Sequence, residues 1–402
     1  MEQQSIEVLR RLDKYLEEAE PKLIAFRRHI HQHPHLSGKE TNTARFISQV
    51  LAGAGIPHRF AASDCGIITE IIRSPDPTAP VIALRADIDA LPIQEETDTL
   101  FRSNNPGVMH ACGHDAHAAM LLTTALALKQ ENNLPFSWRA IFQPSEEEGQ
   151  GAQQLIQEGA LENVAGILAL HVDPNRQIGK AAITPGPRTA FCRDFDIDVR
   201  GRGGHAARPY STIDPIAAAA HLVTLIYQAL PRSSDARDPM VVTVGMINGG
   251  YTSNVIPDLV TLKGTIRALR REVAIDASAT LERLSEATAQ AFRADIKVVF
   301  KNLLNGMVND ELTARTCAEV AREFLGAKNV VSNDPPSLGG EDFADYVAKV
   351  PGCMLTLGVA FPDKKATPLH TATFDLNEAA LLIGPKLLAR CLLHWSKRGA
   401  TV

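Results

Sequence analysis

The segment MHACGHDAH (residues 109–117) concentrates side chains that bind metal ions. Its nine residues include one cysteine, three histidines and one aspartate, with a glycine between Cys112 and His114. A thiolate among the ligands favours zinc, manganese, cobalt or nickel over magnesium or calcium. Because Cys112 and His114 are two positions apart, they cannot share one helix face, but a loop or a helix start can direct both toward one ion. Taken alone, Cys112 could equally be a small buried apolar residue.

Further candidate ligands follow three consecutive predicted strands. The strands are 80–85, 139–144 and 166–170, and they run into Asp87 and Asp89, Glu146 and Glu147, and His171. Strands that alternate with helices predict a mainly parallel sheet. In such sheets, ligands bind beyond the carboxyl ends of the strands. One such strand end could be an ordinary turn, but three strands in a row that end in candidate ligands favour a site.

The candidate ligands are too many for one tetrahedral ion. With His370 from the late segment PLHTATF, they are Cys112, His114, Glu147, His171 and His370. This number suits two adjacent ions, which can hold both the nucleophile and the leaving group of a hydrolysis. Glu146 and Glu147 are neighbours that point in different directions, so one can bind metal while the other accepts a proton from water. The alternative for this acidic run is a solvated loop or helix start.

The elements that must position these residues form an α/β pattern with an insertion. A chain of 402 residues favours two domains. Between residues 188 and 303 the order is strand, helix, strand, strand, helix, strand, which is the split βαβ plan. We therefore predict a catalytic domain, residues 1–187 and 304–402, with a mainly parallel sheet flanked by helices. An inserted α+β, ferredoxin-like domain, residues 188–303, interrupts it.

The N-terminal region is predicted to be helical and ends in a run of histidines. Residues 5–33 have helical spacing, with Pro21 opening a second helix. Glu40 is placed for a capping box of the next helix. The histidines alternate along the chain: His29, His31, His33 and His35. They could form a metal site, but we favour a solvated helix end, where cationic side chains suit the helix dipole.

The inserted domain carries polar residues beside glycines. His205 follows the sequence GRGG and could donate to a developing oxyanion. Asn254 and Arg267 could hold a substrate carboxylate. The alternatives are an incidental histidine in a glycine hairpin and an exposed arginine on a strand. In the catalytic domain, the segment LGGEDF (338–343) could form an anion nest or cap a helix.

The composition excludes several classes of partner. The formal net charge is -5 and the isoelectric point is about 6.2, so we expect no nucleic acid partner. No apolar run has the roughly 18 residues of a membrane span, so no membrane partner is expected. The charged N-terminal sequence lacks the apolar core of an export signal. The six cysteines have no paired spacing, which indicates reduced thiols and a cytoplasmic protein.

The motifs together resemble a known family. In chain order they are RADIDALPIQE, MHACGHDAH, FQPSEEEGQGA, ALHV, GRGGHAARP, SNVIPD, GGEDF and PLHTATFD, and they span nearly the whole chain. This set resembles the bacterial and plant aminoacylase/carboxypeptidase family of metal-dependent amidohydrolases. That family includes hippurate hydrolases, indole-acetyl-amino-acid hydrolases and N-acetyl-diaminopimelate deacetylases. Glu148 and Gln150 stand where members of the family commonly have small residues. This departure concerns the edge of the loop that follows Glu147 and not the set of metal ligands.

The resemblance implies a role for each matching residue. The five candidate ligands named above match the metal ligands of the family, Glu146 matches the general base, and Asp87 and Asp89 match the acidic strand end that supports the site. His205 matches a lid histidine that stabilises the tetrahedral intermediate. The lid commonly dimerises, so a homodimer is expected. Asn254 and Arg267 match polar lid positions near the substrate.

The predicted activity is hydrolysis of the amide bond of an N-acyl amino acid. A hydroxide bridging two metal ions would attack the acyl carbonyl, with Glu146 as general acid and base. The alternative within enzymes is a small-peptide carboxypeptidase or dipeptidase with the same site. A metal-dependent binding protein that has lost catalysis is disfavoured, because no ligand and no base is missing.

Overall fold

The computed structural model describes residues 2–398, which form two compact units. The larger unit holds the described residues up to Gly186, Val308–Pro335 and the described residues from Glu341 onward. The second unit holds Pro187–Met307 and Pro336–Gly340. The segment 336–340, which the sequence placed in the catalytic domain, therefore belongs to the second unit. Backbone hydrogen bonds explain this, since Ser337 N donates to Arg188 O and Ala190 N donates to Gly339 O.

The larger unit is built on an eight-stranded sheet in the order β1-β2-β4-β3-β5-β16-β6-β15. The strands are β1 (His58–Ala61), β2 (Gly66–Thr69), β3 (Val81–Asp87), β4 (Ser137–Gln143), β5 (Gly166–Gln177), β6 (Ala181–Ala182), β15 (Val330–Val331) and β16 (Gly352–Ala360). The four central strands, β4, β3, β5 and β16, are parallel to one another, whereas β2 and β6 pair antiparallel with β4 and β16 on either side. All residues of β3 and β4 are buried, as expected for strands that are covered on both faces. The mainly parallel sheet was predicted correctly.

Strand β5 is longer than the sequence predicted. It was expected to end before His171, but its pairing with β16 continues past that residue, with His171 opposite Thr356 and Val172 opposite Leu357. His171 is therefore held within the sheet, and the rigid strand fixes the position of its imidazole.

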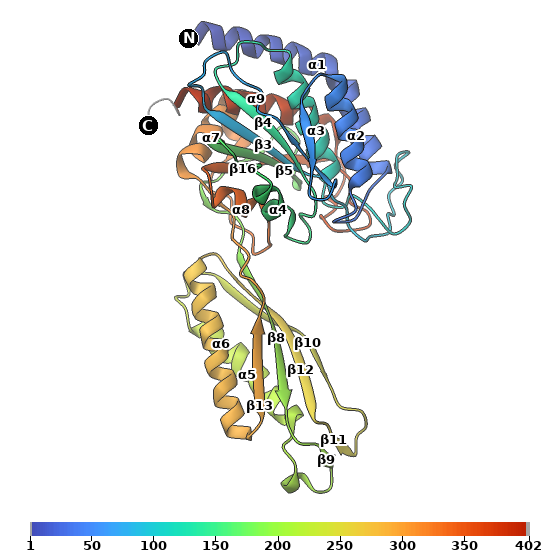
Figure 1. Ribbon diagram of the computed structural model, residues 1–402, viewed down its shortest axis with the longest axis vertical. Helices are drawn as coiled ribbons and strands as arrows, with labels where there is room; N and C mark the ends of the chain where they lie inside the picture. The colour runs from blue at the N-terminus through green and yellow to red at the C-terminus, as the bar shows by residue number, and fades with distance from the viewer. Residues whose placement is uncertain (1, 399–402) are drawn as a thin grey trace. The chain divides into compact units, whose positions relative to one another are not determined.

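Helices flank the sheet of the larger unit (Figure 1). They are α1 (Glu2–Gln32), α2 (Thr41–Gly53), α3 (His114–Lys129), α4 (Gly151–Gln157), α7 (Glu311–Leu325), α8 (Phe343–Val347) and α9 (Ile383–Arg398), with 3-10 turns at Ala327–Asn329 and Glu378–Ala380. Helix α3 packs against α1, α9 and β3, and its residues from His114 to Leu128 are all buried. No helix within residues 2–398 is both long and apolar enough to cross a membrane.

Two predictions for the N-terminal region were wrong. Helix α1 continues through Pro21 instead of breaking there. Buried leucines on both sides of the proline, Leu16 and Leu23, hold the two halves on one core, and this burial offsets the cost of about 3 kcal/mol for a proline inside a helix. Glu40 precedes α2 but makes no capping hydrogen bond. Its carboxylate instead accepts a hydrogen bond from Ser145 N at 2.8 Å.

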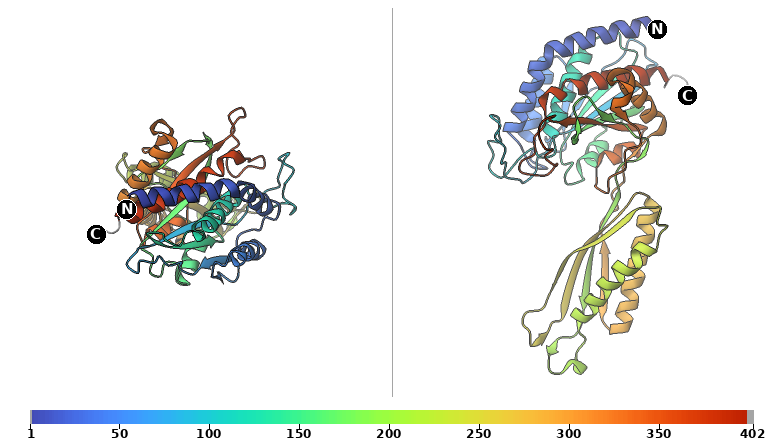
Figure 2. Two further views of the ribbon diagram at one scale, coloured as in Figure 1. Left: turned by 90° about the horizontal axis from the view of Figure 1, so that it is seen from above. Right: turned by 180° about the vertical axis from the view of Figure 1, so that it is seen from behind.

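The second unit has the predicted split βαβ plan. Its elements are β8 (Phe191–Arg200), α5 (Pro215–Ala229), β10 (Met240–Gly249), β12 (Leu259–Ala268), α6 (Arg271–Phe292) and β13 (Asp295–Phe300), with 3-10 turns at Pro209–Ser211 and Leu230–Arg232. The antiparallel sheet has the order β10-β12-β8-β13, and both helices lie on one face of it (Figure 2). A ribbon of two short strands, in which β9 (Gly204–His205) pairs with β11 (Val255–Ile256), completes the second unit. A further short pair, β7 (Gly186–Pro187) with β14 (Val308–Asn309), consists mainly of residues of the larger unit.

Candidate metal centre

A glycine in the left-handed backbone conformation positions the two candidate ligands of the segment 109–117. Gly113 is the N-cap of α3 and has φ +89°, so Cys112 lies just before the helix and His114 is its first residue. A Cβ atom at position 113 would overlap the Cγ2 atom of Val172 on β5. Both the backbone angle and the lack of space therefore require glycine here.

Replacing Gly113 by alanine is expected to weaken metal binding about 10- to 100-fold, the usual loss when a residue that orients a ligand is changed. The new methyl group pushes the start of α3 away from Val172 and moves Cys112 relative to His114. Metal affinity is measured by titration of the metal-free protein. Gly107→Ala is the matched control, because Gly107 also has a positive φ, +77°, but an added Cβ would meet no atom within 4 Å. Equal affinities in the two variants would contradict this prediction.

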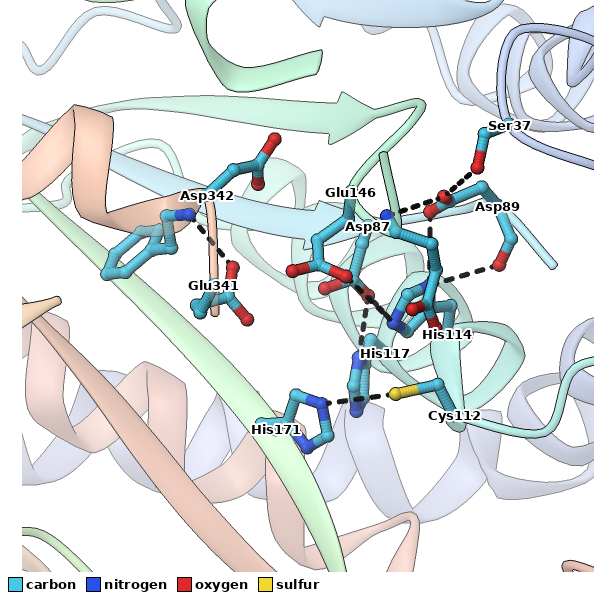
Figure 3. Close-up of polar contacts among 12 residues, drawn as sticks. Ser37, Asp87, Asp89, Cys112, His114, His117, Glu146, His171, Glu341 and Asp342 are labelled. Atoms are coloured by element: carbon cyan, nitrogen blue, oxygen red, sulfur yellow. Dashed lines mark hydrogen bonds and ion pairs between the residues drawn. The ribbon is translucent and has the colours of Figure 1, made fainter. Parts of the chain in front are cut away.

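Four of the five candidate ligands form one connected group around the sulfur of Cys112. Its Sγ atom lies 3.7 Å from His171 Nε2 and 3.3 Å from His370 Nε2. The same nitrogen of His370 lies 3.3 Å from Glu147 Oε1. Figure 3 shows Cys112 and His171 facing each other across the start of α3. The structure thus brings together residues that are more than 200 positions apart in the chain.

The fifth candidate, His114, has the tautomer that a metal ligand needs. Its Nδ1 atom lies 3.0 Å from the carbonyl oxygen of Asp89. A carbonyl oxygen can only accept, so Nδ1 carries the proton and Nε2 offers a lone pair. That Nε2 atom is buried and has no hydrogen-bond partner. His171 follows the same logic, since its Nδ1 lies 2.7 Å from the carbonyl oxygen of Val172.

The donor set fits a pair of divalent metal ions. Besides His114 Nε2, the Oε1 atom of Glu147 is buried and accepts no hydrogen bond. Burial raises the pKa of the Cys112 thiol, so the sulfur holds a proton until a metal ion displaces it. Buried ligand atoms with unused lone pairs are costly in a protein without metal, and coordination of a metal ion would satisfy them.

Asp87, Asp89 and His117 lie beside the candidate ligands, and Asp89 makes hydrogen bonds to two of them. His117 donates from Nδ1 to Asp87 Oδ1 at 2.6 Å, and its Nε2 accepts from Val172 N at 2.9 Å, so neither nitrogen is available for a metal ion. Asp89 contacts two candidate ligands, with Oδ1 3.1 Å from His114 Nδ1 and Oδ2 accepting from Glu147 N at 3.0 Å. Burial would raise the pKa of Asp89, but the hydrogen bond and charge of His114, with hydrogen bonds from Glu147 N and Ser37, together outweigh it and lower the pKa.

Glu146 lies beside the candidate ligands but outside the group that surrounds the sulfur of Cys112. Its Oε2 atom lies 3.9 Å from His114 Nε2 (Figure 3). Burial, with the carboxyl groups of Glu341 and Asp342, raises the pKa of Glu146 well above its ordinary value. The turn that presents it is unusual, because the preceding Ser145 has φ +55° and its N–H is held by Glu40. This role of Glu40 was not predicted.

A buried ionic network beside Glu146 was also missed by the sequence analysis. Arg85 on β3 has a side chain that is only 1% exposed. Its guanidinium donates to Asp87 Oδ2 at 2.6 Å, to Asp342 Oδ1 at 2.9 Å and to Gln143 Oε1 at 2.8 Å, and it pairs with Glu341 Oε1 at 3.1 Å. An arginine in the middle of the buried strand VIALRAD, before the terminal Asp87, was the available signal.

The network also decides between the two alternatives for the segment LGGEDF. The Oε1 atom of Glu341 accepts a hydrogen bond from Phe343 N at 2.8 Å, at the first residue of α8. Asp342 Oδ2 accepts from Ala152 N at 3.0 Å and thereby ties α8 to α4. Glu341 therefore caps the start of α8, Asp342 accepts from the start of α4, and both acids pair with Arg85.

The three candidates of the inserted domain lie in the second unit. His205 on β9 and Asn254, just before β11, are adjacent, since Ala206 N donates to Asn254 O at 3.0 Å. Both side chains are exposed. Arg267 on β12 is separate and donates from Nη1 to the carbonyl oxygen of Leu338 at 3.0 Å. The structure thus brings together two of these three residues.

The amino-acid sequence of the chain is similar to those of known peptidases and deacetylases. Residues 83–394 match the sequence model of Peptidase family M20/M25/M40. The N-acetyl-L-cysteine deacetylase of Bacillus subtilis (strain 168) is 36% identical over 364 residues, which cover 90% of this chain and 85% of that protein. Thermostable carboxypeptidase 1 of Saccharolobus solfataricus is 34% identical over 394 residues, which cover 96% of this chain and 98% of that protein.

Among solved structures, a dinuclear metal-binding M20 peptidase from Bacillus subtilis has the same fold. It superposes with a TM-score of 0.83 at 31% identity, and the match covers 95% of this chain and 99% of that chain. The same fold is therefore found in a relative that is described as a dinuclear metal-binding peptidase.

Proposed function

Because the chain belongs to Peptidase family M20/M25/M40, a family of metal-dependent enzymes that act on amides, we propose that it hydrolyses the amide bond of N-acyl amino acids. The observation that carries the proposal is that the carboxylate of Glu146 lies beside a group of candidate ligands, and that two ligand atoms of this group, His114 Nε2 and Glu147 Oε1, are buried without hydrogen-bond partners. The substrate class is supported by the relative that deacetylates N-acetyl-L-cysteine.

We propose that Cys112, His114, Glu147, His171 and His370 hold two ions of zinc, manganese, cobalt or nickel. Bound there, the ions would polarise the acyl carbonyl and make water a stronger acid. Glu146 then takes the proton of the attacking water and delivers it to the leaving nitrogen. Its raised pKa suits both steps, because a carboxylate with high proton affinity is a better base and carries the proton long enough to return it.

We propose that the second unit supplies the groups that bind the oxyanion and the substrate carboxylate. The Nδ1 atom of His205 lies 3.1 Å from Ala207 N, which can only donate, so Nε2 carries the proton and can donate to an oxyanion. The amide of Asn254 and the guanidinium of Arg267 would bind the carboxylate of the amino acid. We also propose that the second unit mediates a homodimer.

A substrate panel tests the proposed class. The protein is reconstituted with each metal and assayed against N-acetyl and N-benzoyl amino acids and against dipeptides with a free amino group. We expect kcat/KM to be at least about tenfold higher for the N-acyl amino acids, because a protonated amino group beside the scissile bond would be repelled by two divalent ions. Preference for dipeptides would favour a carboxypeptidase or dipeptidase, and no cleavage with metal bound would contradict the proposal.

A further inference from the structure

The segment 37–40, between α1 and α2, contacts the turn that follows β4 and presents the proposed general base. The Oγ atom of Ser37 donates a hydrogen bond to Asp89 Oδ2 at 2.8 Å (Figure 3). The carboxylate of Glu40 accepts a hydrogen bond from Ser145 N, also at 2.8 Å. Neither Ser37 nor Glu40 belongs to the groups of candidate metal ligands found among the described residues. The segment therefore supports the site from outside and supplies no ligand and no base.

Two hydrogen bonds hold the turn, and each of them fixes a different residue. Glu147 N donates to Asp89 Oδ2 at 3.0 Å, so this candidate ligand is held from the end of β3. Ser145 N donates to Glu40, and Ser145 directly precedes Glu146. Because the two supports are separate, loss of the acceptor on Glu40 would disturb the base while Asp89 still holds the ligand.

Ser145 has a backbone conformation that depends on its surroundings. Its φ is +55°, in the left-handed region that residues other than glycine rarely adopt. Such conformations persist only where neighbouring groups hold them in place. Ser145 is 6% exposed, so water has little access to its N–H if the acceptor is lost. The turn would then change its backbone angles to give this N–H another partner, and Glu146, the next residue, would move with it.

The carboxyl group of Glu40 costs the fold stability. Glu40 is buried, and its Oε2 atom has no hydrogen-bond partner among the described residues. Burial, with the charge of Asp89, outweighs hydrogen bonds from backbone N–H groups and raises the pKa of Glu40 to about 7. Both the acid and the carboxylate offer an oxygen that accepts a hydrogen bond. A buried acid with an unused oxygen is unfavourable for the fold, and such departures are expected where a residue serves the site.

We propose that Glu40 is a positioning residue that holds Glu146 in place for proton transfer through its hydrogen bond with Ser145. The inference rests on the proposed function, in which Glu146 is the general base, and it adds a residue that is neither a ligand nor a base. Position 40 requires an acceptor oxygen at the reach of a glutamate side chain. The side chain therefore affects kcat and leaves metal binding and KM unchanged.

Three substitutions separate the hydrogen bond from charge and from packing. Glu40→Gln keeps an acceptor oxygen at the same reach without the negative charge, so its kcat should stay close to that of the wild type. Glu40→Asp keeps the acid, but its side chain is one methylene shorter and should not reach Ser145 N. We expect its kcat to fall about 10- to 100-fold, a common effect of misplacing a catalytic group. Glu40→Leu removes the acceptor at similar volume and should lower kcat at least as much.

Steady-state kinetics with the N-acyl amino acid that the wild type cleaves best give kcat and KM, with metal content determined on the same samples. In every variant at position 40, KM and metal content should match the wild type. Hydrogen exchange of the Ser145 N–H, followed by NMR or mass spectrometry, is a readout that does not depend on turnover. We expect slow exchange in the wild type and Glu40→Gln, and faster exchange in Glu40→Asp and Glu40→Leu. Aspartate is a favoured residue at a helix N-cap, the position of Glu40, so α2 should still form in Glu40→Asp.

Glu158→Asp is the matched control. Glu158 Oε1 accepts a hydrogen bond from Ala62 N at 2.9 Å, and Ala62 also has a positive φ, +49°. The substitution thus removes the same kind of hydrogen bond from the same kind of backbone conformation. Ala62 lies between β1 and β2 and precedes no candidate ligand or base, so kcat and the exchange of the Ser145 N–H should match the wild type.

Normal kcat in both Glu40→Asp and Glu40→Leu would overturn the proposal. So would an equal loss of kcat in Glu40→Gln and Glu40→Asp, because the charge and not the acceptor would then matter. Loss of metal from these variants, or an equal loss of kcat in Glu158→Asp, would also contradict it, since Glu40 would then support the ligands or the fold in general.

Glu146→Gln in the same assay keeps the two proposals apart. If Glu146→Gln retained kcat, the proposed function itself would fail. If it lost kcat while Glu40→Asp remained normal, only the role of Glu40 would be overturned.

Discussion

Replacing Glu146 by glutamine is expected to lower kcat for amide hydrolysis about a thousandfold, within the range of general acid–base catalysis. Glutamine has nearly the same shape but cannot take up a proton at neutral pH. The carboxylate of Glu146 lies 3.9 Å from His114 Nε2, close to His114 and Glu147, but outside the group of Cys112, Glu147 and His370. Because glutamine keeps an oxygen atom at this position, we expect both metal ions to remain bound. Single-turnover and steady-state rates, with metal content measured on the same sample, check this expectation.

The matched control is Glu148→Gln, the same substitution two positions along the acidic run. Glu148 is exposed and should leave kcat within about twofold of the wild type, as expected for a surface change. Near-normal kcat in Glu146→Gln would show that another group moves the proton. Loss of metal from that variant would instead make Glu146 a ligand and would assign the roles of Glu146 and Glu147 differently.

The candidate metal centre could be predicted from the sequence because its candidate ligands have distinctive chemistry and follow recognisable strands. Cys112 and His114 flank a glycine, and Glu146 and Glu147 come directly after the buried strand β4. The strand alternation was sufficient to predict that these segments meet at one edge of a parallel sheet. The split βαβ plan of the second unit followed from its order of strands and helices in the same way.

Other features could not be predicted, because they depend on contacts between distant segments. Glu40 matches a local capping pattern, yet its carboxylate holds Ser145, which is 105 positions later in the chain. Helix α1 passes through Pro21 because both halves pack on one core, and no local pattern records that core. Likewise, the partners of Arg85 come from three separate segments of the chain. Local propensity is a weak guide wherever tertiary packing supplies more free energy than the local rule.

Replacing Arg85 by methionine is expected to lower the free energy of unfolding by about 3–5 kcal/mol, the usual effect of removing one partner of a buried ion pair. Methionine fills a similar volume but leaves Asp87, Glu341 and Asp342 without their shared counter-charge. Burial already raises the pKa of Asp342 to about 8 even with Arg85 in place, so these acids depend strongly on the arginine. Thermal and denaturant unfolding of wild type and variant measure the loss.

The same substitution should also move the pH dependence of catalysis. The positive charge of Arg85 lowers the pKa of Glu146, in opposition to burial and to the two neighbouring acids. Without it, the pKa of Glu146 rises further, and the general base stays protonated until a higher pH. The acid limb of kcat/KM should therefore shift to higher pH, and activity at a fixed pH on that limb should fall. Arg85→Lys, which keeps the charge but not the planar fork, should shift the limb less.

Arg139→Met separates this effect from simple destabilisation. Arg139 is a buried arginine on the adjacent strand β4, but it donates to backbone carbonyl oxygens, namely those of Thr69, Gly159 and Ala160. Its loss should lower stability, because those carbonyls lose their donor, yet it should leave the acid limb where it is in the wild type. If Arg85→Met destabilised the protein without moving the limb, Arg85 would only support the fold. A shift in Arg85→Met alone shows that its charge sets the proton affinity of Glu146.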